Sequence, residues 1–384
     1  MTSLSLKSIT AAFLLATLGV VGCGGTTGSG GGGTTDASTT DTSSGTDASA
    51  QDVAVGPPQT FDYVINAITV DQGLNAAGMP NGMAPDTARH TQSVTGFNLD
   101  GRFSGPNGAD PADCAHGDYF STIDPDQNMG TCTAGMARGG AMCNGGVDNQ
   151  LPAIAETVSG FGTDIRMTLR DQVTQGKIAI LIRVSDVNGT PGPTLNDPSV
   201  QVKVYPVGHP NFASCSNIGM PGQRYVVNTR SLMMGSTSLD NALVSFSGRI
   251  ENGRLKLMPP AGSTMPNFTF NLPIMNMNIP LSLYQTQLRV SLGADTGTNG
   301  SLGGYVPLAS LSSMLATLLP AGIPSSTVQT VLMSLVDVQV PMGNAMGCTA
   351  PNGGISLGLG FTVARAVIDP MPVSAAPMGM CGSM

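Results

Sequence analysis

The residues best suited to chemistry are acids and a histidine in one Gly- and Asn-rich stretch, residues 97–150. The candidates for acid–base work are Asp100, His116, Asp118 and Asp148. His116 stands two residues before Asp118, which fits a metal site or a proton-transfer pair, because imidazole titrates near neutral pH. The alternative is a loop histidine that is merely exposed. If these side chains act together in a hydrolase, we expect them to line one cleft.

A second set of candidates in the same stretch is Asp124, Asp126 and Asn128, whose oxygens occupy alternate positions. Calcium is bound by several oxygen ligands, and alternate residues of a tight loop can point inward together. The spacing resembles the first half of an EF-hand-like or thrombospondin-type calcium loop, which implies a Ca²⁺ ion at these residues. The chain departs from that pattern at Met129, where glycine is expected, and at Gly135, where glutamate is expected. The alternative is a loop whose Asp and Asn side chains bond to their own backbone.

Other catalytic signatures are missing from the sequence. It contains no His-Glu-x-x-His or phosphate-loop pattern, and Glu156 and Glu251 are its only glutamates. Paired carboxylates for glycoside hydrolysis would therefore have to be aspartates. We expect a chain that is not an enzyme. The alternative is a secreted hydrolase that uses the Asp and His residues of the stretch 97–150.

The N-terminal residues carry signals for export. Lys7 precedes an apolar run over residues 9–21, which is too short to span a bilayer core of roughly 30 Å and has the length of a signal-peptide core. The run ends in Val20-Val21-Gly22-Cys23, which resembles the lipobox of bacterial lipoproteins. The resemblance implies cleavage before Cys23 and acylation of its sulfur. Gly24, where inner-membrane lipoproteins often carry Asp, favours the outer membrane, on its periplasmic or its surface side.

Composition divides the chain into four segments. Residues 1–22 form the expected signal peptide, and residues 23–58 form the lipidated cysteine and a Gly/Ser/Thr/Asp tether. Residues 59–160 are a loop-rich region containing Cys, Asp and Gly, and residues 161–384 are a β body. A flexible coil of the tether's length spans roughly 30–35 Å. We therefore expect the tether to hold the body clear of the membrane surface.

Six cysteines remain after Cys23, an even number that fits up to three disulfides in an oxidising compartment. Three of them lie within 30 residues of one another, so we expect at least one bridge in a disulfide-tied loop region. Metal ligation is the alternative, although no Cys-x-x-Cys pair occurs. The six are Cys114, Cys132, Cys143, Cys215, Cys348 and Cys381.

Short alternating segments separated by turn residues predict a mainly β fold, as an antiparallel sandwich or jelly-roll-like body. Asn252-Gly253 predicts a tight hairpin. We expect a short helix over residues 151–158 and a small αα-hairpin at about 306–337 that covers one end or face of the sheet. The expected strands are residues 61–70, 165–170, 176–187, 200–207, 224–234, 242–250, 254–258, 281–292 and 355–367.

The charge and composition limit the function. The net charge is −8, which argues against nucleic acid as a partner, and only 10% of the residues are charged, as in a secreted β protein. The expected partners are the membrane, through the lipid anchor, and an envelope glycan or protein. We expect a non-catalytic body that is structural or binds a ligand. A carrier of lipid or another envelope component is a further alternative, which requires a deep apolar cavity near the helical hairpin.

Two short motifs lie at the two ends of the stretch 97–150. Gly96-Phe97-Asn98-Leu99-Asp100-Gly101 begins it, and Gly146-Val147-Asp148-Asn149-Gln150-Leu151 closes it. Their order, with cysteine between them, resembles a pattern in uncharacterised lipoproteins of Gram-negative bacteria. The resemblance implies a shared architecture and brings no activity with it.

Overall fold

The computed structural model describes residues 57–70, 95–97, 99, 147–159, 164–208, 219–258, 267–274, 277–318, 324–339 and 353–371. The chain divides into two compact units, Met1–Asp52 and Val53–Met384. All described residues belong to the second unit. The expected signal peptide and nearly all of the expected tether, including Cys23, therefore lie outside the described residues.

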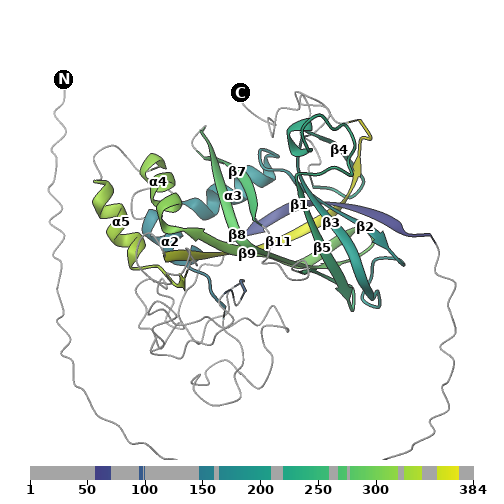
Figure 1. Ribbon diagram of the computed structural model, residues 1–384, viewed down its shortest axis with the longest axis horizontal. Coiled ribbons are helices and arrows are strands. Elements are labelled where there is room, and N and C mark those ends of the chain that lie inside the picture. The colour runs from purple at the N-terminus through teal and green to yellow at the C-terminus, as the bar shows by residue number, and fades with distance from the viewer. Residues whose placement is uncertain are drawn as a thin grey trace, which may run out of the picture. The chain divides into compact units, whose positions relative to one another are not determined.

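Eight strands close into an antiparallel barrel in the order β1-β2-β3-β5-β6-β8-β9-β11 (Figure 1). The ring closes where β11 pairs with β1, for example at Val64 and Ala364. The prediction of a mainly β fold is confirmed. A sandwich or jelly roll is not confirmed, because the strands form one closed sheet. The barrel strands are β1 (Gln59–Thr69), β2 (Ile180–Val187), β3 (Asp197–Gly208), β5 (Val244–Glu251), β6 (Arg254–Met258), β8 (Met277–Leu292), β9 (Thr296–Pro307) and β11 (Gly353–Ile368).

Three further strands of the described part of the chain pair with barrel strands. β4 (Gln223–Val227) pairs antiparallel with the end of β3 and parallel with the end of β11. β7 (Phe268–Ile274) forms a hairpin with β8, and β10 (Val338–Gln339) pairs with the start of β11. Tyr225 of β4 is buried in a hydrophobic cluster with Val64 and Tyr205 of the barrel. β4 therefore covers part of the barrel wall from outside.

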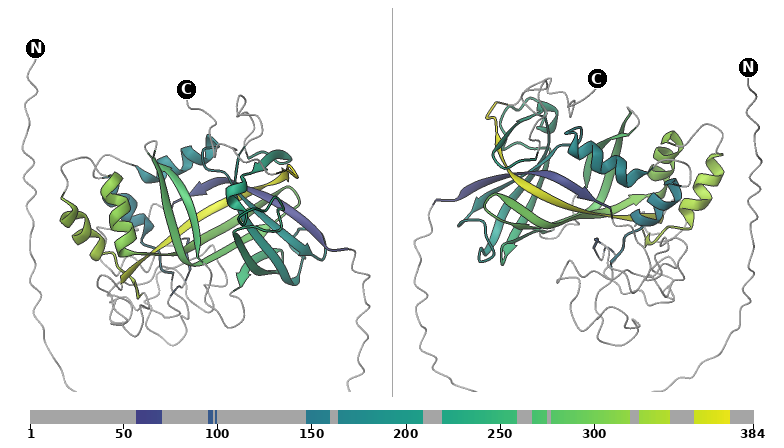
Figure 2. Two further views of the ribbon diagram at one scale, coloured as in Figure 1. Left: turned by 45° about the horizontal axis from the view of Figure 1, so that its top comes forward. Right: turned by 180° about the vertical axis from the view of Figure 1, so that it is seen from behind.

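In the described ranges, four α-helices accompany the barrel: α2 (Leu151–Ser159), α3 (Ile165–Thr174), α4 (Leu308–Leu318) and α5 (Ser325–Met333). The expected short helix and the expected αα-hairpin are confirmed as α2 and as α4 with α5. Figures 1 and 2 show α2, α4 and α5 gathered at one end of the barrel, while α3 packs beside β1. None of the helices in the described ranges is long and apolar enough to cross a membrane.

One predicted strand is wrong, because residues 165–170 belong to helix α3. Asp164 caps this helix by accepting hydrogen bonds from the backbone N–H groups of Arg166 and Met167, at 2.9 and 3.2 Å. Its buried side chains, Ile165, Leu169 and Val173, recur every four residues. The short apolar–polar alternation was therefore misleading, and the cap with the helical spacing is the stronger signal.

The tight hairpin predicted at Asn252-Gly253 is confirmed. Ile250 pairs with Leu255, and Glu251 pairs with Arg254, so β5 and β6 are joined by a two-residue turn. Asn252 and Gly253 both have positive φ, 50° and 74°, as such a turn requires. This hairpin supplies two of the eight barrel strands. Its register is thus set locally.

Candidate functional site

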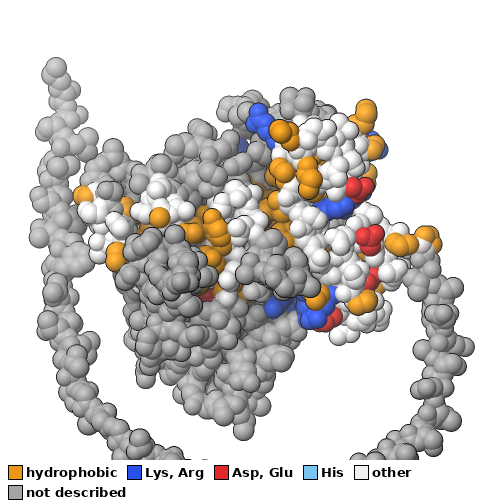
Figure 3. Space-filling view, viewed as in Figure 1, with side chains coloured by type: hydrophobic (Ala, Val, Ile, Leu, Met, Phe, Trp, Pro, Cys, Tyr) orange, Lys and Arg blue, Asp and Glu red, His pale blue; other side chains and the backbone are white. Residues whose placement is uncertain are grey.

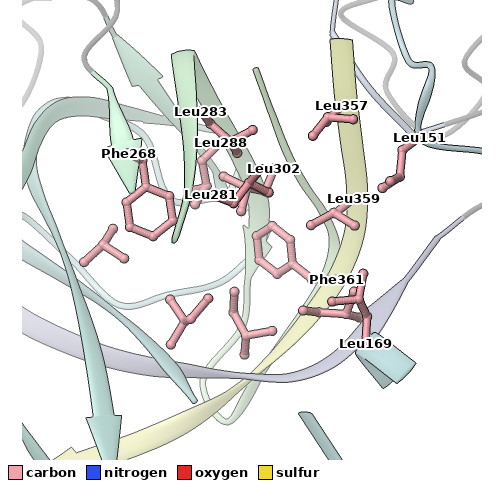
Figure 4. Packing of buried hydrophobic residues seen from close by; sticks show 14 of the residues in the cluster. Leu151, Leu169, Phe268, Leu281, Leu283, Leu288, Leu302, Leu357, Leu359 and Phe361 are labelled. Atoms are coloured by element: carbon pink, nitrogen blue, oxygen red, sulfur yellow. The ribbon is translucent and has the colours of Figure 1, made fainter. Parts of the chain in front are cut away.

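An apolar cavity of about 60 Å³ lies inside the barrel, beneath the helices. All described side chains that line it are Ile, Leu or Phe. They come from strands on several sides of the barrel and from α2, α3 and α4. Figure 4 shows Leu281, Leu302, Leu357 and Phe361 turned into the common interior. The strand residues are Ile65, Ile68, Ile180, Leu281, Leu283, Leu302, Leu357, Leu359 and Phe361, with Ile178 just before β2; the helical residues are Leu151, Ile154, Ile165, Leu169, Leu311 and Leu315.

Strand β11 lines one side of the cavity, because its large apolar side chains alternate with glycines and so fall on one face. Leu357, Leu359 and Phe361 face the interior, since side chains two residues apart lie on the same face of a strand. Gly358 and Gly360 fall between them and face the outside of the barrel. A row of large apolar side chains on the inside is therefore matched by a row without side chains on the outside.

The outer face of β11 holds a cluster of buried polar groups, which we call the outer polar cluster: Asp148, Asn149, Gln150, Asp337 and Ser356. Asp148 forms an isolated bridge with Phe97, and its N–H donates to the Phe97 carbonyl at 2.9 Å. The Asp148 carboxylate accepts a hydrogen bond from the Leu99 N–H at 2.7 Å. The two motifs that frame residues 100–146 are thus bonded directly to each other.

Asn149 connects this paired segment to the barrel. Its side-chain N–H groups donate to the carbonyls of Thr95 and Gly358, at 2.6 and 3.2 Å. Its side-chain oxygen accepts from the N–H groups of Gly358 and Leu151, at 2.9 and 3.0 Å. One buried amide therefore joins the 95–97 segment, strand β11 and the first residue of α2.

Glycines on the outer wall allow this close approach. A Cβ at Gly358 would overlap the Thr95 carbonyl oxygen and lie 2.8 Å from Asn149 Nδ2. A Cβ at Gly303 of β9 would lie 2.7 Å from the ring of Phe97. Real Cβ atoms do not approach so closely, so no other residue type fits at either position without movement. The glycine content of β9 and β11 is thus a requirement of the segment packed against them.

Asp337 and Ser356 complete the outer polar cluster. The Ser356 hydroxyl and N–H both donate to the Asp337 carboxylate, the second at 2.8 Å. Burial raises the pKa of Asp337 to about 7, and hydrogen bonds from Ser356 and Gln150 offset only part of that rise. Ser356 is 0% exposed and Asp337 only 4%, so a substrate has no access to the pair. The arrangement holds β10, β11 and the start of α2 together, because Gln150 also donates its N–H to the Ser356 carbonyl at 3.0 Å.

Of the residues that the sequence singled out for chemistry, only Asp148 is described. It lies in the outer polar cluster and serves the backbone of Leu99. The other acid–base candidates, Asp100, His116 and Asp118, lie outside the described residues, as do Asp124, Asp126 and Asn128 of the expected calcium loop. The same holds for Cys114, Cys132, Cys143, Cys215, Cys348 and Cys381. Within the described ranges, no group of three or more His, Cys, Asp or Glu residues is placed to hold a metal ion.

The cavity residues were not selected from the sequence, although one signal was available. Leu357-Gly358-Leu359-Gly360-Phe361 alternates large apolar residues with glycine. Such alternation indicates a strand with an apolar interior face and an outer face packed closely against another segment. The partners of β11 across the cavity, such as Leu311 of α4, could not be assigned because no local pattern links them.

No family model, no curated protein and no solved structure matches this chain. The assignment of a function therefore depends on the geometry of the cavity and of the outer polar cluster.

Proposed function

We propose that this chain is an exported lipoprotein whose barrel binds the hydrocarbon part of a lipid or of a similar apolar ligand in the cavity beneath α4. The observation that carries the proposal is the lining of the cavity by Ile, Leu and Phe alone among the described residues. Ligand sites usually combine an apolar lining with a few polar groups that fix orientation. A lining without polar groups favours a flexible hydrocarbon chain, whose polar head stays at the entrance.

The helical hairpin supports the carrier alternative over a purely structural body. A carrier requires an apolar cavity near this hairpin, and Leu311 and Leu315 of α4 line the cavity directly. Helix α4 begins at Leu308, immediately after β9 ends at Pro307, so one end of the helix is tied to the barrel. Its inner face is held by apolar side chains, which can repack around a ligand without loss of hydrogen bonds.

The size of the cavity indicates that loading involves movement. An engineered cavity of about 150 Å³ lined by similar side chains holds one benzene molecule. The cavity here is about 60 Å³, which is too small for a hydrocarbon chain unless its walls move. We propose that α4 moves outward when the ligand enters, and that the barrel strands, which are hydrogen-bonded on both sides, stay in place.

The rest of the proposal comes from the sequence. The segment that ends in Cys23 resembles a lipobox, and residues 24–58 have the composition of a flexible tether. An anchored carrier would pick up its ligand from the membrane or from another envelope protein. Of the residues that the hydrolase alternative would use, only Asp148 is described, and its carboxylate accepts a hydrogen bond from the Leu99 N–H.

The test is to look for bound lipid in the purified lipoprotein, by organic extraction and mass spectrometry, and to titrate it with a fluorescent fatty acid. We expect Leu315→Ala to bind more of the probe, because it enlarges the cavity. Leu292→Ala is the matched control, since Leu292 is equally buried, at 4% exposure, and does not line the cavity. If the wild-type chain holds no lipid and binds no probe, or if both variants respond equally, the proposal is wrong.

A further inference from the structure

The connection between β4 and β5 forms an exposed hairpin, residues 231–243. The Met233 N–H donates to the Asn241 carbonyl at 2.8 Å, and the Leu243 N–H donates to the Ser231 carbonyl at 2.9 Å. Between these bonds, Leu232 and Ala242 form a bridge and are buried against the barrel wall. Because side chains alternate along paired segments, Met233 and Leu243, which follow Leu232 and Ala242, are directed to solvent.

The solvent side of the exposed hairpin is apolar. Met233, Met234 and Leu243 are 55, 103 and 59% exposed. Single exposed apolar side chains are ordinary on a protein surface, but a group of them on one element indicates an interaction site. Figure 3 shows hydrophobic side chains gathered on the surface around β4, with Lys or Arg side chains beside them.

The apolar side chains are presented on an ordered turn. The Ser236 N–H donates to the Met233 carbonyl at 2.9 Å, and Asn241 Nδ2 donates to Ser236 Oγ at 3.0 Å. Gly235, with a φ of 80°, allows the sharp reversal after Met234. The exposure is thus a feature of the folded hairpin and does not come from a frayed end.

The charges near the exposed hairpin are basic. Arg230 lines a groove together with Met234 and Leu243, and Arg224 is exposed on β4. Neither arginine forms an ion pair with a described residue. The hairpin's acid, Asp240, is bound to Lys203 at 2.9 Å, and this contact lowers the pKa of Asp240. Among the described residues, the surface around Met234 is therefore apolar and carries arginines that no described acid pairs with, although the whole chain carries −8.

We propose that the exposed hairpin inserts Met233, Met234 and Leu243 into the surface of an anionic lipid bilayer, with Arg230 at the headgroups. Apolar side chains beside cations are the combination that binds membrane interfaces. Three side chains are too few for a stable protein dimer, which buries roughly 800 Å² on each partner. They suffice if the chain is anchored through Cys23 as proposed above, because a lipid anchor supplies a high local concentration of membrane. This inference rests on the lipid anchor of the proposed function and does not rest on ligand binding in the cavity.

The chain has no tryptophan, so a single introduced tryptophan reports on its own surroundings. We would reconstitute the acylated Met234→Trp protein in vesicles of phosphatidylcholine and phosphatidylglycerol. The expected result is a blue-shifted emission and strong quenching by brominated phosphatidylcholine. Met167→Trp is the matched control, because Met167 is an exposed methionine of α3, away from the hairpin. Its emission should stay that of a residue in water.

Charge is tested in the same system. Adding Arg230→Ala to the Met234→Trp protein should lower the docked population roughly five-fold, because one arginine near an anionic surface is worth about 1 kcal/mol. Absence of quenching, equal quenching in the Met167→Trp control, or failure of the chain to reconstitute through Cys23 would each overturn the proposal. A blue shift that grows with protein concentration without vesicles would assign the surface to a second copy instead.

Discussion

The two faces of strand β11 differ in how they are held. On the inside, Leu357, Leu359 and Phe361 border a cavity and depend on apolar packing alone. On the outside, Ser356 and Gly358 take part in a dense set of directional hydrogen bonds with Asp337 and Asn149. Apolar packing tolerates rearrangement, whereas a buried hydrogen bond that loses its partner is costly. One strand thus combines an adaptable face with a rigid one.

The largest effect is expected from Asn149→Ala, which breaks the rigid face. The substitution leaves the Thr95 carbonyl and both backbone groups of Gly358 without their side-chain partner. We expect the free energy of unfolding to fall by about 4–5 kcal/mol. Each buried group left without a partner costs about 1–3 kcal/mol. Urea denaturation followed by circular dichroism measures it. Asn196→Ala, at an exposed residue, should cost less than about 1 kcal/mol; equal losses would contradict a special role for Asn149.

A somewhat smaller effect is expected from pH, through Asp337. Its pKa is raised from 3.8 to about 7, so between these values the folded protein keeps a proton that the unfolded chain has released. The contribution of Asp337 to the free energy of unfolding should therefore be largest below pH 4. It should fall, on the order of 3–4 kcal/mol, as the pH rises to 7.

Asp337→Asn should remove this slope, which unfolding at several pH values would measure. Asp240→Asn is the control with the opposite sign, because Lys203 lowers the pKa of Asp240. That contact stabilises the fold at neutral pH and is lost only as the pH falls through the acidic range. An Asp337→Asn protein with the same slope as the wild type would show that Asp337 is not the group responsible.

The smallest effect is expected from Leu311→Phe, which fills space on the adaptable face. The larger ring can enter the cavity, so the free energy of unfolding should change by less than about 1 kcal/mol in either direction. Leu255→Phe is the comparison, since Leu255 is fully buried in the barrel and does not line the cavity. It should cost about 1–3 kcal/mol by overpacking. Similar melting temperatures for the two variants would mean that the cavity is not adaptable.

The fold was predictable where local signals decide it. Asn252-Gly253 marked a hairpin, and the apolar spacing of residues 306–337 marked the α4–α5 hairpin. Closure of the barrel was not predictable, because it requires β1 to pair with β11 from the far end of the chain. β9 was also missed, since its glycines, such as Gly303, weaken the strand signal that β-branched residues normally provide.

The site was predicted less well than the fold. Asp148 was selected as an acid for chemistry, but the structure places it against the backbone of Leu99, whose N–H donates to its carboxylate. The contact between Asp337 and Ser356 could not be predicted from the sequence, because the two residues meet only when β10 pairs with β11. The cavity is likewise assembled from separate elements. Residues that meet only through long-range contacts cannot be identified from their spacing in the sequence.

The bond between Phe97 and Asp148 also has a consequence for how the chain tolerates change. It brings the two ends of residues 100–146 together on the wall of a barrel that is complete without them. When the ends of a loop are fixed side by side, extra length costs little, because closure entropy grows only with the logarithm of loop length. The segment between Leu99 and Val147 is therefore a suitable place to insert another domain. A foreign domain spliced between Leu99 and Val147 should leave the barrel intact.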